Sequence, residues 1–139
     1  MVKVLVLDDY RLGRRLLADE LTDEGYEVVE NEAVGAALNL IQAERPDLLV
    51  MEIRAPYGDF LPLVYDIKKH HEDLPVIIWT CLAESKNDPR VRAADYFVLK
   101  SSSLTEIKKS LRRAVKNLTR LHGGILEGAP CPCQFQGFL

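Results

Sequence analysis

The chain has 139 residues, of which 47% are hydrophobic and 28% charged, which is typical of one globular domain. Its net charge of −3 argues against a nucleic-acid partner, which would require a basic face, and no apolar run approaches the roughly 18 residues of a membrane span. Three cysteines, an odd number, without an export signal predict free thiols and a cytoplasmic location.

The first part of the chain alternates between short apolar runs and helical spacing. Residues 2–7 predict a strand that is covered on both faces. Apolar residues at helical spacing over 12–21 predict a helix, which Gly25 ends. A short strand over 26–30 then precedes a second helix over 34–41.

The same alternation continues through the middle of the chain. Residues 48–53 and 76–80 predict two further apolar strands, with a helix over 61–68 between them. The pattern weakens over 82–94, where Pro89 allows only a short helix because proline cannot lie inside one.

The last predicted elements are a fifth strand over 96–99 and a long helix over 104–118. Ser103 and Glu106 have the spacing of a capping box, which predicts where this helix begins. The periodic pattern then stops at Gly123 and Gly124.

Strands that alternate with helices imply right-handed crossovers and a parallel sheet. We therefore predict an α/β fold: a doubly wound, five-stranded parallel sheet, flavodoxin-like, with strand order 2-1-3-4-5. The domain is placed at residues 1–122 and a flexible C-terminal tail at 123–139. The tail contains Cys131-Pro132-Cys133, which is too short for a zinc site with four ligands.

Polar residues follow or end several of the predicted strands. Because ligands of open α/β sheets bind beyond the carboxyl ends of the strands, we expect these residues to share one acidic pocket with one lysine. They are Asp8 and Asp9 after the first strand, Glu52 on the third, Thr80 on the fourth and Lys100 after the fifth.

Four segments, in order, resemble the two-component response-regulator receiver domain. The resemblance covers about residues 2–121, and although each segment alone is a weak signal, all four fall at the expected strand ends. The segments are Val6-Leu7-Asp8-Asp9, residues 46–56 (PDLLVMEIRAP), residues 76–80 (VIIWT) and residues 95–100 (DYFVLK).

This resemblance implies a set of site roles. In the family, the acidic pair holds Mg²⁺, and an aspartate on the third strand accepts phosphate from a histidine kinase. A threonine and a lysine contact the phosphoryl group, and an aromatic residue three positions before the lysine reorients. The matching positions here are Asp8, Asp9, Glu52, Thr80, Phe97 and Lys100.

The acceptor position departs from the family, because it holds Glu52 instead of aspartate. Glutamate is longer by one methylene, roughly 1.5 Å, which displaces the carboxylate from the position of an attacking nucleophile. We therefore expect Glu52 to accept phosphate poorly or not at all, and to pair with Lys100 or Arg54 or accept a hydrogen bond from Thr80. Two interpretations stay open: a structural carboxylate, or a partial mimic of phosphoaspartate.

Asp8, Asp9 and Glu52 also suit a divalent ion, since Mg²⁺ prefers oxygen ligands and keeps several waters. The candidate metal ligands are Asp9 and Glu52. The alternative is that Arg54 neutralises the acids without metal.

Several other residues receive a structural interpretation. Phe97 is expected to be a half-buried packing residue, and Trp79 to face the sheet packing. Arg11, Arg14 and Arg15 are expected to form a solvated helix face.

The function predicted from these residues is that of an atypical receiver, which acts by protein–protein interaction and is not an enzyme. Its expected partner is a histidine kinase or a downstream signalling protein, and a homodimer through the fourth helix, fifth strand and fifth helix is a further expectation. The alternatives are a conventional receiver phosphorylated on another carboxylate such as Asp9, and a small flavodoxin-like enzyme or cofactor carrier. Against the latter, no glycine-rich phosphate loop follows the first strand.

Overall fold

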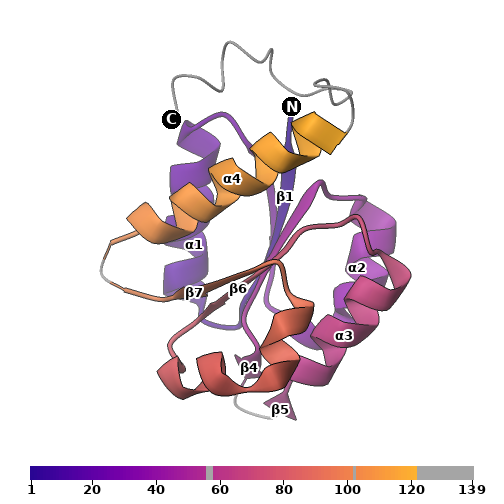
Figure 1. Ribbon diagram of the computed structural model, residues 1–139. Coiled ribbons are helices and arrows are strands. Elements are labelled where there is room, and N and C mark those ends of the chain that lie inside the picture. Colours follow the sequence, from indigo (N-terminus) through magenta and orange to yellow (C-terminus); the bar gives the residue numbers. More distant parts are fainter. Residues whose placement is uncertain (56–57, 102, 122–139) are drawn as a thin grey trace.

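A computed structural model of the chain describes residues 1–55, 58–101 and 103–121 (Figure 1). Its central sheet has five parallel strands in the order β2-β1-β3-β6-β7. This confirms the predicted order 2-1-3-4-5, because β4 (Arg54–Ala55) and β5 (Gly58–Asp59) form a separate antiparallel hairpin. The sheet strands are β1 (Lys3–Leu7), β2 (Glu27–Asn31), β3 (Leu48–Met51), β6 (Val76–Thr80) and β7 (Tyr96–Leu99).

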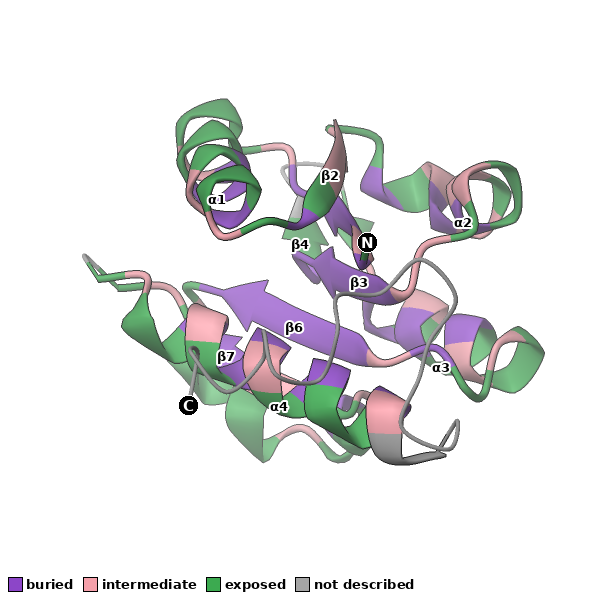
Figure 2. Ribbon diagram, turned by 90° about the horizontal axis from the view of Figure 1, so that it is seen from above, coloured by how far each residue is buried: buried purple, intermediate pink, exposed green. Residues whose placement is uncertain are grey.

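Helices cover both faces of the sheet, as Figure 2 shows from above. Helices α1 (Arg11–Asp23) and α4 (Thr105–Leu121) lie on one face. Helices α2 (Ala37–Glu44) and α3 (Leu61–His70) lie on the other. This arrangement is the three-layer solution for a parallel sheet whose strands are apolar on both sides.

The strand side chains alternate between two apolar clusters. From β1, Val4 and Val6 contribute to the cluster under α1 and α4, whereas Leu5 and Leu7 contribute to the cluster under α2 and α3. Successive side chains of a strand point to opposite faces, so a strand buried on both faces must be apolar throughout. The nearly continuous apolar runs of the sequence therefore become the centre of the molecule.

The predicted short helix over 82–94 differs in the structure. In its place are two 3₁₀ segments, η2 (Ala83–Asn87) and η3 (Pro89–Ala93). Pro89 has no N–H to donate, so it begins a new segment, and the Asp88 side chain caps that segment by accepting from Arg90 N. A third such segment, η1 (Val34–Ala36), precedes α2.

Helix ends follow the sequence in part. Gly25, with φ of 96°, follows α1 as predicted. At the start of α4, Ser103 Oγ accepts from Thr105 N at 3.2 Å, but Glu106 lies 3.7 Å from Lys109 and makes no return bond within the part of the chain described. The capping box is therefore only half formed.

A cluster of contacts fixes the amino end of β7. Asp95 Oδ2 accepts from Val76 N at 2.8 Å and from Lys68 Nζ at 2.9 Å. Lys68 Nζ also donates to the carbonyls of Leu74 and Glu72, at 2.8 and 2.9 Å. Helix α3, the turn after it and the start of the edge strand are thereby tied together.

The predicted tail over 123–139, with its cysteine motif, lies outside the described residues. Among those that are described, none of the helices combines the length and the apolar character needed to cross a bilayer. Cys81 is exposed and is not in a disulfide.

Candidate functional site

The carboxyl ends of the parallel strands bring three charged residues together. Asp8 follows β1, Glu52 follows β3 and Lys100 follows β7. Backbone bonds continue past the strand ends, because Glu52 N donates to Leu7 O at 2.9 Å and Lys100 N donates to Thr80 O at 2.8 Å. Each charged side chain is therefore positioned by the sheet itself.

Lys100 makes an ion pair with both acids. Its Nζ lies 2.6 Å from Asp8 Oδ2 and 3.3 Å from Glu52 Oε1. The exposed fractions of the side chains are 13% for Lys100, 1% for Asp8 and 9% for Glu52. Because these side chains are so little exposed, solvent and salt screen their attraction less than that of a surface salt bridge.

Each acid also accepts a backbone hydrogen bond through its other oxygen. Asp8 Oδ1 accepts from Tyr10 N at 2.9 Å, and Glu52 Oε2 accepts from Ile53 N at 2.9 Å. In each carboxylate, one oxygen is thus fixed by the backbone and the other is turned toward Lys100.

The surroundings of Lys100 act on its charge in opposite directions. Burial lowers the pKa of the ammonium, but the adjacent Asp8 carboxylate, together with Glu52, outweighs burial and raises the pKa above its ordinary value. Two aromatic rings add a further attraction: Nζ lies 4.9 Å from the centre of the Trp79 ring and 5.8 Å from that of Tyr10. Lys100 is therefore a cation that two carboxylates and two aromatic rings attract.

Arg14 contacts the backbone of Asp8, and the sequence analysis missed this contact. It was expected on a solvated face, but it is only 8% exposed. Its Nε donates to Glu30 Oε1 at 2.9 Å and its Nη1 to the Asp8 carbonyl at 2.5 Å. The signal was present, because Arg14 precedes the buried Leu17 and Leu21 by three and seven positions on one helix face.

Two predicted site residues, Thr80 and Phe97, take no part in the ion pair. Thr80 is fully buried, and its Oγ1 accepts from Leu82 N at 3.3 Å. Phe97 is half-buried and packs against the apolar cluster under α2 and α3. In this arrangement Glu52 receives no hydrogen bond from Thr80 among the contacts of the described residues.

Asp9 and Arg54 are placed apart from the ion pair. Asp9 is half-buried and contacts neither Lys100 nor another described residue by hydrogen bond or ion pair. Arg54 is exposed and does not pair with Glu52, since Lys100 takes that role. The structure thus brings together Asp8, Glu52 and Lys100 from the predicted acidic pocket.

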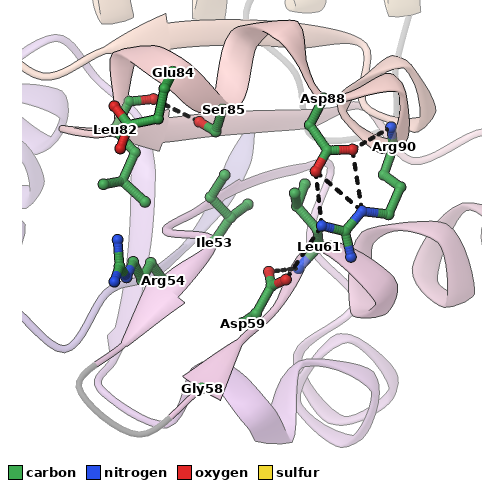
Figure 3. A pocket seen from close by; sticks show the side chains of 10 residues that line it. All are labelled: Ile53, Arg54, Gly58, Asp59, Leu61, Leu82, Glu84, Ser85, Asp88 and Arg90. Atoms are coloured by element: carbon green, nitrogen blue, oxygen red, sulfur yellow. Dashed lines mark hydrogen bonds and ion pairs between the residues drawn. The ribbon is translucent and has the colours of Figure 1, made fainter.

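Arg54 instead lines a neighbouring open pocket of about 580 Å³ between the β4–β5 hairpin and η2–η3 (Figure 3). Across it from Arg54, Arg90 Nη2 lies 3.3 Å from Asp59 Oδ2 and 2.7 Å from Asp88 Oδ2. This Arg90 clamp links the hairpin to η3.

The acids are suited to a divalent ion. Asp8 Oδ2 is buried, and its one partner among the described residues is Lys100 Nζ at 2.6 Å. Asp9 adds a second carboxylate on the same loop. No cluster of three or more metal-ligating side chains forms among the residues described, but Mg²⁺ is commonly held by only one or two carboxylates and waters.

Comparison with known sequences gives a consistent match. The sequence model of the response regulator receiver domain matches residues 4–112. The chain is 30% identical over 122 residues to response regulator MprA of Mycolicibacterium vanbaalenii, covering 85% of this chain and 52% of that protein. It is 34% identical over 125 residues to the probable transcriptional regulator ycf27 of Porphyra purpurea, covering 86% and 51%. The chain thus spans about half the length of these curated relatives.

Solved structures agree with the sequence matches. Response regulator protein TrrA of Thermotoga maritima, in complex with Mg²⁺ and BeF, has a TM-score of 0.77 and 32% identity, covering 82% of this chain and 99% of that one. TrrA in complex with the histidine kinase ThkA has a TM-score of 0.76 and 31% identity, covering 83% and 99%. Chemotaxis response regulator CheY4 of Vibrio cholerae, with a TM-score of 0.72 and 24% identity, covers 82% of this chain and 98% of that chain, and shares the fold.

Proposed function

This chain belongs to the response regulator receiver family, and on that premise we propose that it is an atypical receiver that signals by protein–protein interaction without phosphorylation of Glu52. The observation that carries the proposal is the contact between Glu52 and Lys100 at 3.3 Å. Glu52, at the acceptor position, is already paired with the lysine that would contact a phosphoryl group.

The length of Glu52 supports this assignment. A phosphate acceptor must attack phosphorus in line, and an added methylene moves its oxygens by roughly 1.5 Å, a displacement that can reduce reactivity on the order of 100-fold. Both Glu52 oxygens are also engaged, one by Ile53 N and the other by Lys100. The carboxylate therefore has neither the position nor the freedom of a nucleophile.

We further propose that Glu52 imitates phosphoaspartate in part. Its carboxylate extends toward Lys100 from the acceptor position, as a phosphoryl group would. It carries one negative charge, compared with roughly −1.5 to −2 for a phosphoryl group, so the imitation is incomplete. In that role Asp8 and Asp9 would still hold Mg²⁺, the ion bound with BeF by TrrA, and the ion would neutralise the clustered acids.

The proposed partner is a histidine kinase or a downstream signalling protein, in line with the complex of TrrA with ThkA. We place the contact surface on η2–η3, β7 and α4, which also offers a route to a homodimer. The chain is proposed to be a signalling domain and not an enzyme. A cytoplasmic site of action is part of this proposal and rests on the family alone.

Phosphorylation with radiolabelled acetyl phosphate in the presence of Mg²⁺ tests the proposal. We expect no stoichiometric label on the native chain or on Glu52→Gln, and recovery of labelling in Glu52→Asp, which restores the shorter acceptor. Labelling of the native chain that disappears in Glu52→Gln would overturn the proposal.

Labelling that persists in Glu52→Gln would favour a conventional receiver that uses another carboxylate. Asp9 is the first candidate, because its side chain is half-buried and makes no described contact. Mass spectrometry of the labelled peptide would identify the residue. The mimic role is tested separately, since Glu52→Asp and Glu52→Gln should weaken binding to a partner recovered with the native chain.

A further inference from the structure

We propose that the C-terminal segment, residues 123–139, packs back on its own chain and covers an exposed apolar ridge on α1. The ridge consists of Leu12 and Leu16. The contact is independent of Glu52 and of the acidic pocket. It controls access to this face of α1, because a partner that binds there must first displace the segment.

The first argument is the ridge itself. Leu12 is 74% exposed and Leu16 is 55% exposed, and their spacing of four residues places both side chains on one face of the helix. Six large apolar side chains are exposed among the described residues, and three of them fall between positions 10 and 16. Single exposed leucines are ordinary, but a group of them marks a contact surface.

The second argument is the composition of the C-terminal segment. One of its side chains is charged, that of Glu127, whereas two of the four phenylalanines of the chain are found in it. Ile125, Leu126 and Leu139 add further apolar surface. Such side chains gain free energy when they leave water, so the segment has the chemistry of a partner for exposed leucines.

The third argument is the place from which the segment starts. Helix α4 lies beside α1 on the same face of the sheet. Lys108 Nζ is 3.0 Å from Glu20 Oε2. One turn further along both helices, Arg112 Nη2 is 3.4 Å from Glu24 Oε1, so the two helices run in the same general direction. The segment therefore begins on the face of the sheet that carries the ridge.

The segment is also long enough to reach the ridge. A path from Leu121 back along α4 to Arg112 and then along α1 to Leu16 covers roughly 25 Å of helix, and the step between two packed helices adds about 10 Å. Phe135 follows Leu121 by 14 residues, which span roughly 45–50 Å when extended. The phenylalanines of the segment can therefore reach Leu16 with length to spare.

A nitroxide attached to Cys131 locates the segment on the full chain. Cys81→Ser and Cys133→Ser first leave one thiol for the label. We expect the nitroxide to broaden the backbone amide signals of residues 12–19 in two-dimensional NMR spectra. Amides of α3 should keep their intensity, because α3 lies on the opposite face of the sheet.

The double substitution Leu12→Ser and Leu16→Ser removes the ridge. Burial of one leucine shifts an equilibrium by roughly tenfold or more, so the equilibrium constant for docking should fall at least about tenfold and the broadening over α1 should weaken. The matched control is Tyr65→Ser, which removes a side chain that is 61% exposed on α3. This control should keep the broadening, and the amide spectra verify that each variant is folded.

Three results would contradict the proposal. The first is the absence of broadening over residues 12–19, which would leave the ridge to a protein partner. The second is broadening that stays the same in the double variant, or that weakens equally in Tyr65→Ser. The third comes from a mixture of nitroxide-labelled chains with isotope-labelled chains that carry no nitroxide. Broadening in that mixture would show that the segment of a second copy covers the ridge.

Discussion

Two regions near the carboxyl edge of the sheet are held in different ways. Around Lys100, charges are buried and each acid is fixed by a strand end and a backbone hydrogen bond. In the β6–β7 crossover, the Arg90 clamp is exposed, with 48% of the Arg90 side chain and 57% of Asp59 accessible to water. The first region is part of the core, whereas the second is a surface segment attached to it.

This difference indicates which part of the fold can vary without altering the pocket. The crossover contains η2 and η3 where a helix was expected, yet the strand ends keep their positions. The pocket depends on the register of the strands and not on the structure of the crossover. The sequence of this segment can therefore change while the ion pair stays the same. The predictions below test that independence, from the largest effect to the smallest.

Arg14→Met should give the largest loss of stability. The substitution keeps an apolar side chain but removes the buried guanidinium that joins Glu30 to the Asp8 carbonyl. We expect the free energy of unfolding to fall by about 2–3 kcal/mol, since Glu30 Oε1 and the buried Asp8 carbonyl each lose a hydrogen bond from a charged donor. Urea denaturation measures this change.

Arg15→Met is the matched control, because Arg15 contacts the same Glu30 at 2.7 Å but is 57% exposed. We expect its loss to stay below about 1 kcal/mol. Equal losses in the two variants would show that burial does not separate these contacts, and the contrast between core and surface charges would fail.

High pH should destabilise the core through Tyr26. Burial, followed by the charge of Glu24, raises the pKa of Tyr26 to about 12, against the opposing effect of Arg112. The folded state thus holds the phenolic proton more tightly than the unfolded state. The stability from this difference is complete below pH 10 and is lost as pH rises toward 12, by roughly 2–3 kcal/mol.

Tyr26→Phe removes this titration, so its free energy of unfolding should depend less on pH in the same window. The raised pKa of Lys100 acts in the same direction and would remain. Denaturation at several alkaline pH values measures both chains. An equally steep pH dependence in Tyr26→Phe would show that Tyr26 is not the group that titrates.

Arg90→Met should have the smallest effect on the whole molecule. Its ion pairs with Asp59 and Asp88 are exposed, so the urea midpoint should stay unchanged. Amide hydrogen exchange over residues 83–93 should become faster, because the Arg90–Asp59 ion pair joins η3 to the hairpin. A lower midpoint without faster local exchange would mean that the crossover is part of the core after all.

The sequence predicted the strands and the pocket because both follow from simple patterns. Continuous apolar runs such as 48–53 and 76–80 specify strands buried on both faces, and parallel strands place their ends at one edge. The positions of Asp8, Glu52 and Lys100 followed from that geometry without any knowledge of side-chain conformations.

The remaining features depend on tertiary packing. Whether Glu52 meets Lys100 or Arg54 depends on side-chain direction, which spacing does not determine. The burial of Arg14 and the approach of Tyr10 to Lys100 arise from how α1 rests on the sheet. The crossover was mistaken for a helix because Pro89 gave the position of a break but not the type of turn on either side.

Strand β7 lies at the edge of the sheet and pairs with β6 alone. Asp95 tethers its beginning through Val76 and Lys68, and Lys100 tethers its end through the ion pair. Val98 and Phe97 pack into the two apolar clusters between these points. Lys100 therefore adds a polar attachment at the pocket end of an edge strand whose one neighbour in the described sheet is β6.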